Sequence, residues 1–330
     1  MTNSNSSPPR PDEFELIAEL FAPLATSPRA FGLKDDAAII PESGTADLVV
    51  TADALIEGVH FLESDPADSI AKKALRVNLS DLAAKGCKPH GYLLVLAIPS
   101  NVDMPWLTAF ARGLGEDQKA FGISLLGGDT SSTPGPLTIA ITAFGLIPKE
   151  AMLRRSGAKT GDLVYVSGTI GAAEGGLACL KEIATPINAP DRELLIQRYR
   201  LPEPRLSLGQ ALRGLATSAI DVSDGLLADL GHVADASRVR IVVDAARVPV
   251  HAALTALWGE ETVVHASTAG DDYEIAFTAP ASMCRQIAEA ANSCGISVTE
   301  IGRVEEGAGT VFVDKSGREI SVAQKGFRHF

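Results

Sequence analysis

The 330-residue chain contains few cysteines, few aromatic side chains and less positive than negative charge. Its four cysteines are widely spaced and include no Cys-x-x-Cys pair: Cys87, Cys179, Cys284 and Cys294. This spacing argues against a disulfide framework or a zinc site and favours a reducing cytoplasm. Lysine and arginine total 29 against 41 aspartates and glutamates, which gives a formal net charge of −12. Because nucleic acids and anionic membranes are bound by basic patches, neither is expected as a partner.

Long apolar runs and several well-known catalytic motifs are also missing. No apolar stretch approaches the length of a membrane span. The chain has no Gly-x-x-x-x-Gly-Lys-Ser/Thr loop, no His-Arg-Asp with a downstream Asp-Phe-Gly, and no Gly-x-Ser-x-Gly elbow. P-loop enzymes and protein kinases are therefore not indicated. Residues 1–12 are polar, lack the apolar stretch of a signal peptide and are predicted to form a disordered tail.

Alternating strand and helix patterns predict a mixed α/β (α+β) chain. The first half is predicted to contain a helix at 13–21, a strand at 47–53, helices at 67–85 and 104–120, and strands at 92–98, 123–126 and 137–146. The alternation restarts after Pro148, with strands at 163–167, 218–221, 240–243, 273–278 and 298–304, helices at 172–183, 209–215, 226–236 and 282–293, and a hairpin at 310–320. We expect an N-terminal domain over 13–150 and a C-terminal domain over 151–330.

Single carboxylates interrupt the apolar pattern of the first half. Asp36 belongs to an aspartate pair that comes after Gly32, Asp53 ends the strand at 47–53, Asp81 interrupts an otherwise apolar helix, and Asp129 directly follows Gly128. Taken singly, aspartates at such positions are commonly turn or capping residues. If several of them converge, however, cations must neutralise their mutual repulsion. Oxygen ligands without histidine or cysteine select magnesium or calcium rather than zinc.

The strongest signal lies in the second half, at Asp221, Ser223 and Asp224. Asp221 ends a predicted strand, and the other two stand at the start of the predicted helix 226–236. One N-cap residue would be explained by the helix alone, but three polar groups would not. Backbone amides at a helix start suit phosphate oxygens, and bridging metal ions allow an acidic cleft to accept ATP. These features predict magnesium-dependent phosphoryl transfer from ATP.

Eight short motifs, in a fixed order, resemble the thiamine-monophosphate kinase family of the aminoimidazole ribonucleotide synthetase superfamily. They span residues 35–38, 51–53, 57–61, 78–84, 127–130, 155–158, 220–225 and 270–274. The resemblance implies an N-terminal domain that forms a homodimer through its sheet and a C-terminal α/β domain that covers the cleft. It also implies direct in-line transfer of the γ-phosphoryl group of ATP to thiamine monophosphate, assisted by several magnesium ions and giving thiamine diphosphate.

The resemblance further assigns roles to individual positions. The implied metal ligands are Asp36, Thr51, Asp53, Asp81, Asp129, Asp221 and Asp224. The implied nucleotide contacts are Gly128, Asp129, Arg155 and Ser223. The implied catalytic residues are Asp129, Asp224 and Arg155. Thiamine monophosphate is expected to face His60, Asp271 and Phe327. Three positions depart from the family pattern: Lys34 stands where glycine is usual, Ala52 replaces a hydroxyl residue, and Asp271 replaces glutamate.

Two other interpretations remain open on the sequence. The first is a different enzyme of the same superfamily, such as an aminoimidazole ribonucleotide synthetase. A selenophosphate synthetase is disfavoured because no cysteine precedes Cys87. The second is a non-catalytic protein that binds divalent metal ions, which clustered acids alone would allow. The glycines beside Asp129 and the helix start at Ser223 favour phosphate chemistry over this second interpretation.

Overall fold

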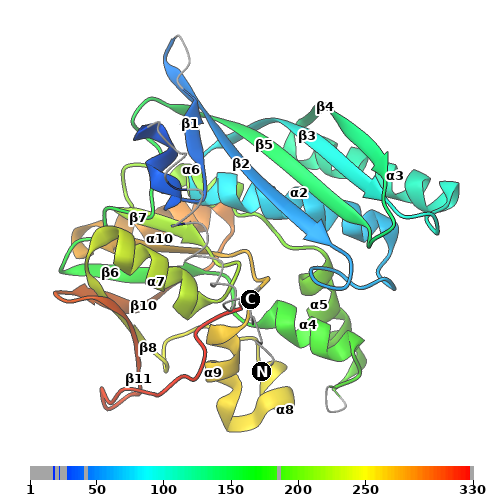
Figure 1. The fold of residues 1–330 in the computed structure, drawn as a ribbon. Coiled ribbons are helices and arrows are strands. Elements are labelled where there is room, and N and C mark those ends of the chain that lie inside the picture. The colour runs from blue at the N-terminus through cyan, green and yellow to red at the C-terminus, as the bar shows by residue number, and fades with distance from the viewer. Residues whose placement is uncertain (1–17, 19–21, 23–27, 41–43, 184–186, 328–330) are drawn as a thin grey trace, which may run out of the picture.

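The computed structural model describes residues 18, 22, 28–40, 44–183 and 187–327. These residues form two mixed sheets with helices packed against them (Figure 1). The prediction of a mixed α/β fold is confirmed. The tail predicted at 1–12 and nearly all of the helix predicted at 13–21 lie outside the described residues.

The first sheet has the strand order β1-β2-β5-β3-β4. Its strands are β1 (Ala38–Ile40), β2 (Ala46–Ile56), β5 (Thr138–Pro148), β3 (Lys88–Ile98) and β4 (Ser124–Ser132). Neighbours run antiparallel except β3 and β4, which are parallel. Every second residue of β5 is buried, because strand side chains alternate between the two faces of a sheet. The helices α2 (Ala67–Ala84) and α3 (Met104–Phe121) contact each other, and α2 covers β2 and β5.

The second sheet has the order β11-β8-β10-β6-β9-β7. It is built from β6 (Asp162–Ser167), β7 (Ser218–Asp221), β8 (Arg240–Asp244), β9 (Ile275–Pro280), β10 (Val298–Glu305) and β11 (Gly309–Val313). The chain also forms α4 (Ala172–Leu180), α5 (Ala189–Arg200), α6 (Leu206–Ala211), α7 (Leu226–Ser237), α8 (Leu254–Trp258), α9 (Thr262–Thr268) and α10 (Cys284–Cys294). Helix α7 packs on this sheet, and α6 reaches across to α2. The sequence patterns did not predict α5, α8 or α9.

Two predicted elements differ from the structure in ways that matter for the site. The strand predicted at 123–126 continues to Ser132 as β4, so Gly128 and Asp129 lie within a strand and not on a loop. A Cβ atom at Gly128 would lie 1.7 Å from the carbonyl oxygen of Leu94, so this glycine is required by close pairing with β3. The hairpin predicted at 310–320 is reduced to an isolated bridge between Val313 and Glu319, because β11 pairs with β8.

Helix α2 is the element that both halves of the protein share. It packs on the first sheet and also contacts β7 and α6 of the second half. At the contact with α6, a Cβ atom on Gly209 would lie only 1.8 Å from the carbonyl oxygen of Ala83. The position of α2 relative to the second sheet therefore depends on a glycine at 209.

We expect Gly209→Ala to lower the free energy of unfolding by about 1–3 kcal/mol, because the added methyl group meets backbone that cannot move without separating α6 from α2. Gly115→Ala is the matched control, since Gly115 lies in helix α3 with nothing within 4 Å of the added atom. Alanine is the better helix former, so the control should be neutral or stabilising by up to about 1 kcal/mol. Urea denaturation of both variants checks this, and equal stabilities would contradict it.

Candidate active site

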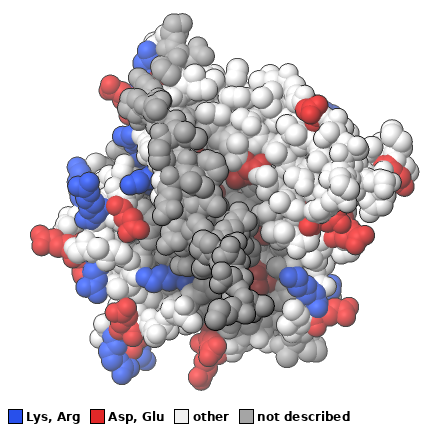
Figure 2. Space-filling view, in the orientation of Figure 1, with Lys and Arg blue, Asp and Glu red and all other residues white. Residues whose placement is uncertain are grey.

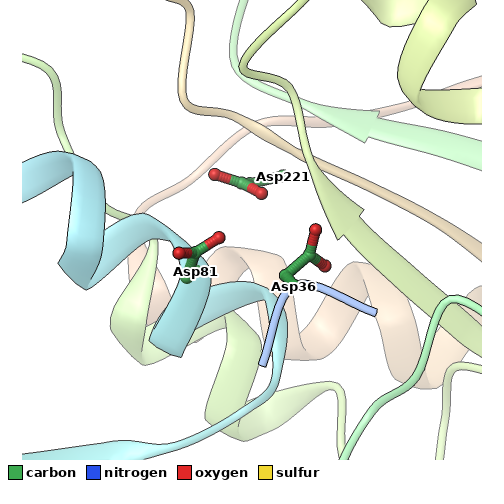
Figure 3. Close-up of side chains that lie close together, drawn as sticks. All are labelled: Asp36, Asp81 and Asp221. Atoms are coloured by element: carbon green, nitrogen blue, oxygen red, sulfur yellow. The ribbon is translucent and has the colours of Figure 1, made fainter. Parts of the chain in front are cut away.

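Three carboxylates meet where the two halves of the protein come together. Asp36 lies two residues before β1, Asp81 lies on α2, and Asp221 is the last residue of β7. One oxygen of each lies within 4.8 Å of the others. Figure 3 shows the three side chains pointing toward one another from these separate segments. The folded chain thus brings together three of the aspartates that the sequence singled out.

Burial and like charge act together on this cluster. Burial raises the pKa of Asp81 well above its ordinary value, and the nearby Asp53, Asp221 and Asp36 raise it further. The same two causes raise the pKa of Asp221 to about 7. They also raise the pKa of Asp53, which neighbours Asp36 and Asp224, to about 6. The protein's own cationic groups neutralise this negative charge only in part, and a site of this kind favours the binding of a cation.

Asp36 differs from its neighbours because two cationic side chains contact it. The ammonium of Lys85 lies 2.6 Å from Asp36 Oδ2 and 2.9 Å from Asp35 Oδ1. The guanidinium of Arg155 donates to the other oxygen, Asp36 Oδ1. Burial would raise the pKa of Asp36, but the charges of Arg155 and Lys85 hold it well below its usual range. Burial likewise opposes the charge of Lys85, and the two aspartates outweigh it, raising the pKa of Lys85 to about 12.

Hydroxyl and amide side chains hold the remaining oxygens in place. Thr51 Oγ1 donates to Asp81 Oδ2 and lies 3.1 Å from the carbonyl oxygen of Asp36. Ser80 Oγ donates to Asp221 Oδ2 at 2.7 Å. Asn78 Oδ1 accepts from the backbone amide of Asp53 at 3.1 Å. The polar residues that interrupt α2 therefore all have partners, as their burial requires.

A cavity of about 280 Å³ opens beside this cluster. One wall is acidic and includes Asp53, Asp81, Asp221 and Asp224. The rest is largely apolar or aromatic, formed by Leu55, Val59, Val77, Leu177, Tyr199, Tyr273 and Phe327. His60, Glu174, Ser223 and Asp271 also line it. The cavity thus combines carboxylates suited to cations with apolar and aromatic side chains suited to a planar organic group.

Asp271, which lines the cavity, is held by a network that the sequence did not reveal. Lys73 Nζ donates to Asp271 Oδ2 at 2.8 Å and to the carbonyl oxygen of His60 at 2.9 Å. The hydroxyl of Tyr273 donates to Asp271 Oδ1 at 3.1 Å. Asp271 and Tyr273 both have left-handed backbone conformations, with φ of 69° and 52°. Such conformations cost of order 1–3 kcal/mol for each residue and occur most often at functional sites.

The loop at Ser223 and Asp224 is shaped by Asp229, one turn into α7. Asp229 Oδ2 accepts hydrogen bonds from the backbone amides of Ser223, Asp224 and Gly225, at 3.1, 3.2 and 3.1 Å. The sequence predicted that amides at this helix start would suit phosphate. That expectation is wrong for these three amides, because a buried carboxylate already occupies them. The loop instead presents its side chains to the cavity.

Asp129 and Gly128 are not brought to this cavity within one chain. They lie on β4, the edge strand of the first sheet, whose nine residues are all exposed. Phe327 does reach the cavity, and its backbone amide donates to the carbonyl oxygen of Asp224 at 2.9 Å. His60 Nδ1 accepts from the amide of Ile56 at 3.0 Å, which in the neutral ring leaves the proton on Nε2.

The sequence predicted no role for six residues that support the site but are not among its acidic lining residues. These are Asp35, Lys73, Lys85, Tyr199, Asp229 and Tyr273. A signal existed for the two lysines, since Lys73 falls within the mostly buried face of α2 and Lys85 directly follows that helix. A lysine in an apolar helix face requires a buried anion nearby.

The donor set of the cluster fits a hard divalent cation. Asp36, Asp81 and Asp221 offer only oxygen atoms, and neither cysteine nor histidine takes part in the group. Magnesium and calcium prefer such ligands, and the short distances between the carboxylates favour one shared ion over separate charges.

Among the described residues, no helix is both long enough and apolar enough to span a membrane.

Comparisons with known proteins agree with this geometry. Residues 34–147 match the family described as AIR synthase related protein, N-terminal domain, and residues 159–315 match its C-terminal domain. The two-domain prediction is confirmed, whereas the limits 13–150 and 151–330 stay predictions.

Thiamine-monophosphate kinase of Caulobacter vibrioides is 43% identical over 97% of this chain and 91% of its own length. The enzyme of Escherichia coli K12 is 40% identical over 96% and 98%. The solved structure of AaThiL complexed with AMPPCP and TMP superposes with a TM-score of 0.85 at 31% identity, covering 98% of this chain and 100% of that one. The chain therefore belongs to the thiamine-monophosphate kinase family of enzymes, within the AIR synthase-related proteins.

Proposed function

We propose that the protein transfers the γ-phosphoryl group of ATP to thiamine monophosphate in a magnesium-dependent reaction that forms thiamine diphosphate. The observation that carries this proposal is the cavity that is lined by both clustered carboxylates and aromatic side chains. The carboxylates suit metal-bound phosphates, and the aromatic side chains suit a heterocycle. The AaThiL structure, with AMPPCP and TMP bound together, supports the same pair of substrates.

At the acidic wall, we propose that several magnesium ions are held by Asp36, Thr51, Asp53, Asp81, Asp221 and Asp224. When bound, these ions supply the positive charge that lets phosphates enter an acidic site and that offsets charge in the transition state. Arg155 pairs with Asp36, and its planar guanidinium is suited to phosphate oxygens. Ser223, with Asp224 beside it, faces the same space.

Asp271, His60 and Phe327 are proposed to contact thiamine monophosphate. Lys73 and Tyr273 fix the Asp271 carboxylate, which suits a cationic or amino-bearing ring. The aromatic side chains that line the cavity offer faces for stacking. The acceptor phosphate is already ionised at neutral pH, so in-line transfer needs alignment and charge neutralisation more than a general base.

We also propose that the protein is a homodimer joined through its first sheet. Strand β4 is a fully exposed edge, and such edges are normally covered. Leu93, Val95, Leu125 and Leu126 are exposed on β3 and β4. Figure 2 shows few charged side chains over the upper part of the molecule, where this sheet lies. A second copy would then place Gly128 and Asp129 at an interface, where Asp129 could serve the partner's cavity.

The location that we propose is the cytoplasm. All four cysteines, Cys87, Cys179, Cys284 and Cys294, are free thiols. Free, widely spaced thiols fit a reducing compartment.

The remaining alternative is another ATP-using enzyme of the AIR synthase-related proteins, such as an aminoimidazole ribonucleotide synthetase. Such an enzyme would use the same acidic wall of the cavity with a different acceptor. The departure at Asp271, one methylene shorter than the usual glutamate, bears directly on this choice.

With ATP and magnesium, we expect conversion of thiamine monophosphate to thiamine diphosphate and no phosphorylation of thiamine, which lacks the ionised phosphate acceptor. Phosphorus NMR over a panel of acceptors measures this directly. Asp221→Asn should lower turnover by about two orders of magnitude or more, because it removes a metal ligand. Circular dichroism checks that this variant remains folded. Turnover with a different acceptor, and none with thiamine monophosphate, would contradict the acceptor assignment while leaving the metal chemistry intact.

A second experiment tests the dimer and the role of Asp129 together. Asp129→Asn and Asp221→Asn should each be inactive alone. Unfolded and refolded together, they should recover about one quarter of wild-type activity, because half of the dimers are mixed and each mixed dimer has one intact cavity. No recovery in a confirmed mixture would place Asp129 outside the partner's site. A monomer by light scattering would contradict the dimer.

A further inference from the structure

Lys85 is a charged side chain in an unusual place. It directly follows α2, and its side chain is 0% exposed. Its ammonium contacts Asp35 and Asp36 from the first half and donates to the carbonyl oxygen of Ala219, on β7, at 3.1 Å. A buried ammonium is tolerated only when anions and hydrogen-bond acceptors surround it closely. Lys85 meets this condition at the junction of the two halves.

Lys85 also lies next to the carboxylate cluster. Asp36 belongs to the group whose oxygens approach within 4.8 Å, and Lys85 contacts its Oδ2 atom. The other two members, Asp81 and Asp221, accept hydrogen bonds from the hydroxyls of Thr51 and Ser80. Lys85 therefore brings a full positive charge into contact with this group at Asp36.

Two cations contact Asp36, and they differ in their freedom to move. The side chain of Arg155 is 19% exposed, and among the salt bridges of the described residues Asp36 is its partner. Lys85 is enclosed and is anchored by the carbonyl oxygen of Ala219 as well as by two carboxylates. The charge of Lys85 is therefore fixed in place more firmly than that of Arg155.

We propose that Lys85 is a built-in cation of the metal site, which fixes Asp36 in position before any divalent ion binds and supplies one positive charge that such an ion would otherwise provide. The proposal rests on the metal site proposed above and is independent of the identity of the phosphate acceptor. Lys85 acts through Asp36 and is a positioning residue.

The alternative is that Lys85 only joins the two halves of the protein. Both roles predict that Lys85→Met lowers stability, so stability alone cannot separate them. They differ in the response to magnesium. If Lys85 supplies charge to the cluster, its loss leaves the carboxylates more repulsive, and an added divalent ion should recover much of what was lost. If Lys85 only joins the halves, magnesium should stabilise the variant no more than the wild type.

The experiment is thermal unfolding of the wild type, Lys85→Met, Lys85→Arg and Arg76→Met, each in EDTA and in magnesium chloride, without nucleotide. Arg76→Met is the matched control. Arg76 also lies on α2 and pairs closely with a buried aspartate, Asp117, at 2.6 Å, but neither residue lines the cavity. Lys85→Arg keeps the charge.

We expect magnesium to raise the Tm of Lys85→Met at least twice as much as that of the wild type, and to raise the Tm of Lys85→Arg and Arg76→Met by the wild-type amount. Folding of Lys85→Met only in magnesium would support the proposal equally. An increase equal to that of the wild type, or a chain unfolded in both conditions, would overturn it. A wild type that does not respond to magnesium would overturn the metal site as well, whereas failure of the acceptor assay would affect neither.

Discussion

The repulsion among aspartates buried at the junction of the two halves is the constraint on which the rest of the site depends. Asp36, Asp81 and Asp221 come from a loop, a helix and a strand, and they meet within 4.8 Å. Burial and mutual charge raise the pKa of the last two. Protonation relieves this repulsion, and so does a cation that offsets the charge. Lys85 and Arg155 do so in part, and the oxygen-only donor set suits divalent ions for the remainder.

Helix α2 organises the molecule around this constraint. It packs on the first sheet, contacts β7 and α6 of the second half, and carries Asp81 toward the junction. Its buried lysine Lys73 reaches Asp271 in the second half, and Lys85 follows at its end. The carboxylate cluster and Asp271 are thus positioned by one helix. A change in how α2 docks would move both together.

Much of the fold could be read from the sequence, because its signals are local. The strand patterns located β7 with its observed ends and β2, β3, β5, β6, β8, β9 and β10 with shifted ends, and the long helices α2, α3, α7 and α10 were found. The helices α5, α8 and α9 were missed. Helix α5 is largely polar, so it offers little periodic signal, and α8 and α9 are short. The extent of β4 was wrong because strand pairing with β3, not local propensity, carries the chain through Gly127 and Gly128.

The sequence by itself determined the kind of chemistry and the residue types that carry it. Carboxylates that interrupt apolar strands and a packed helix are costly to bury. Their presence in the sequence therefore predicts a cation site before the fold is known. Only the tertiary structure decided which of them share a site. It joined Asp36 to Asp81 and Asp221, left Asp129 on an exposed edge, and gave Asp36 the partners Lys85 and Arg155. The physical reason is that charge interactions depend on distance in space, and residues 36, 81, 155 and 221 become neighbours only when both sheets dock on α2.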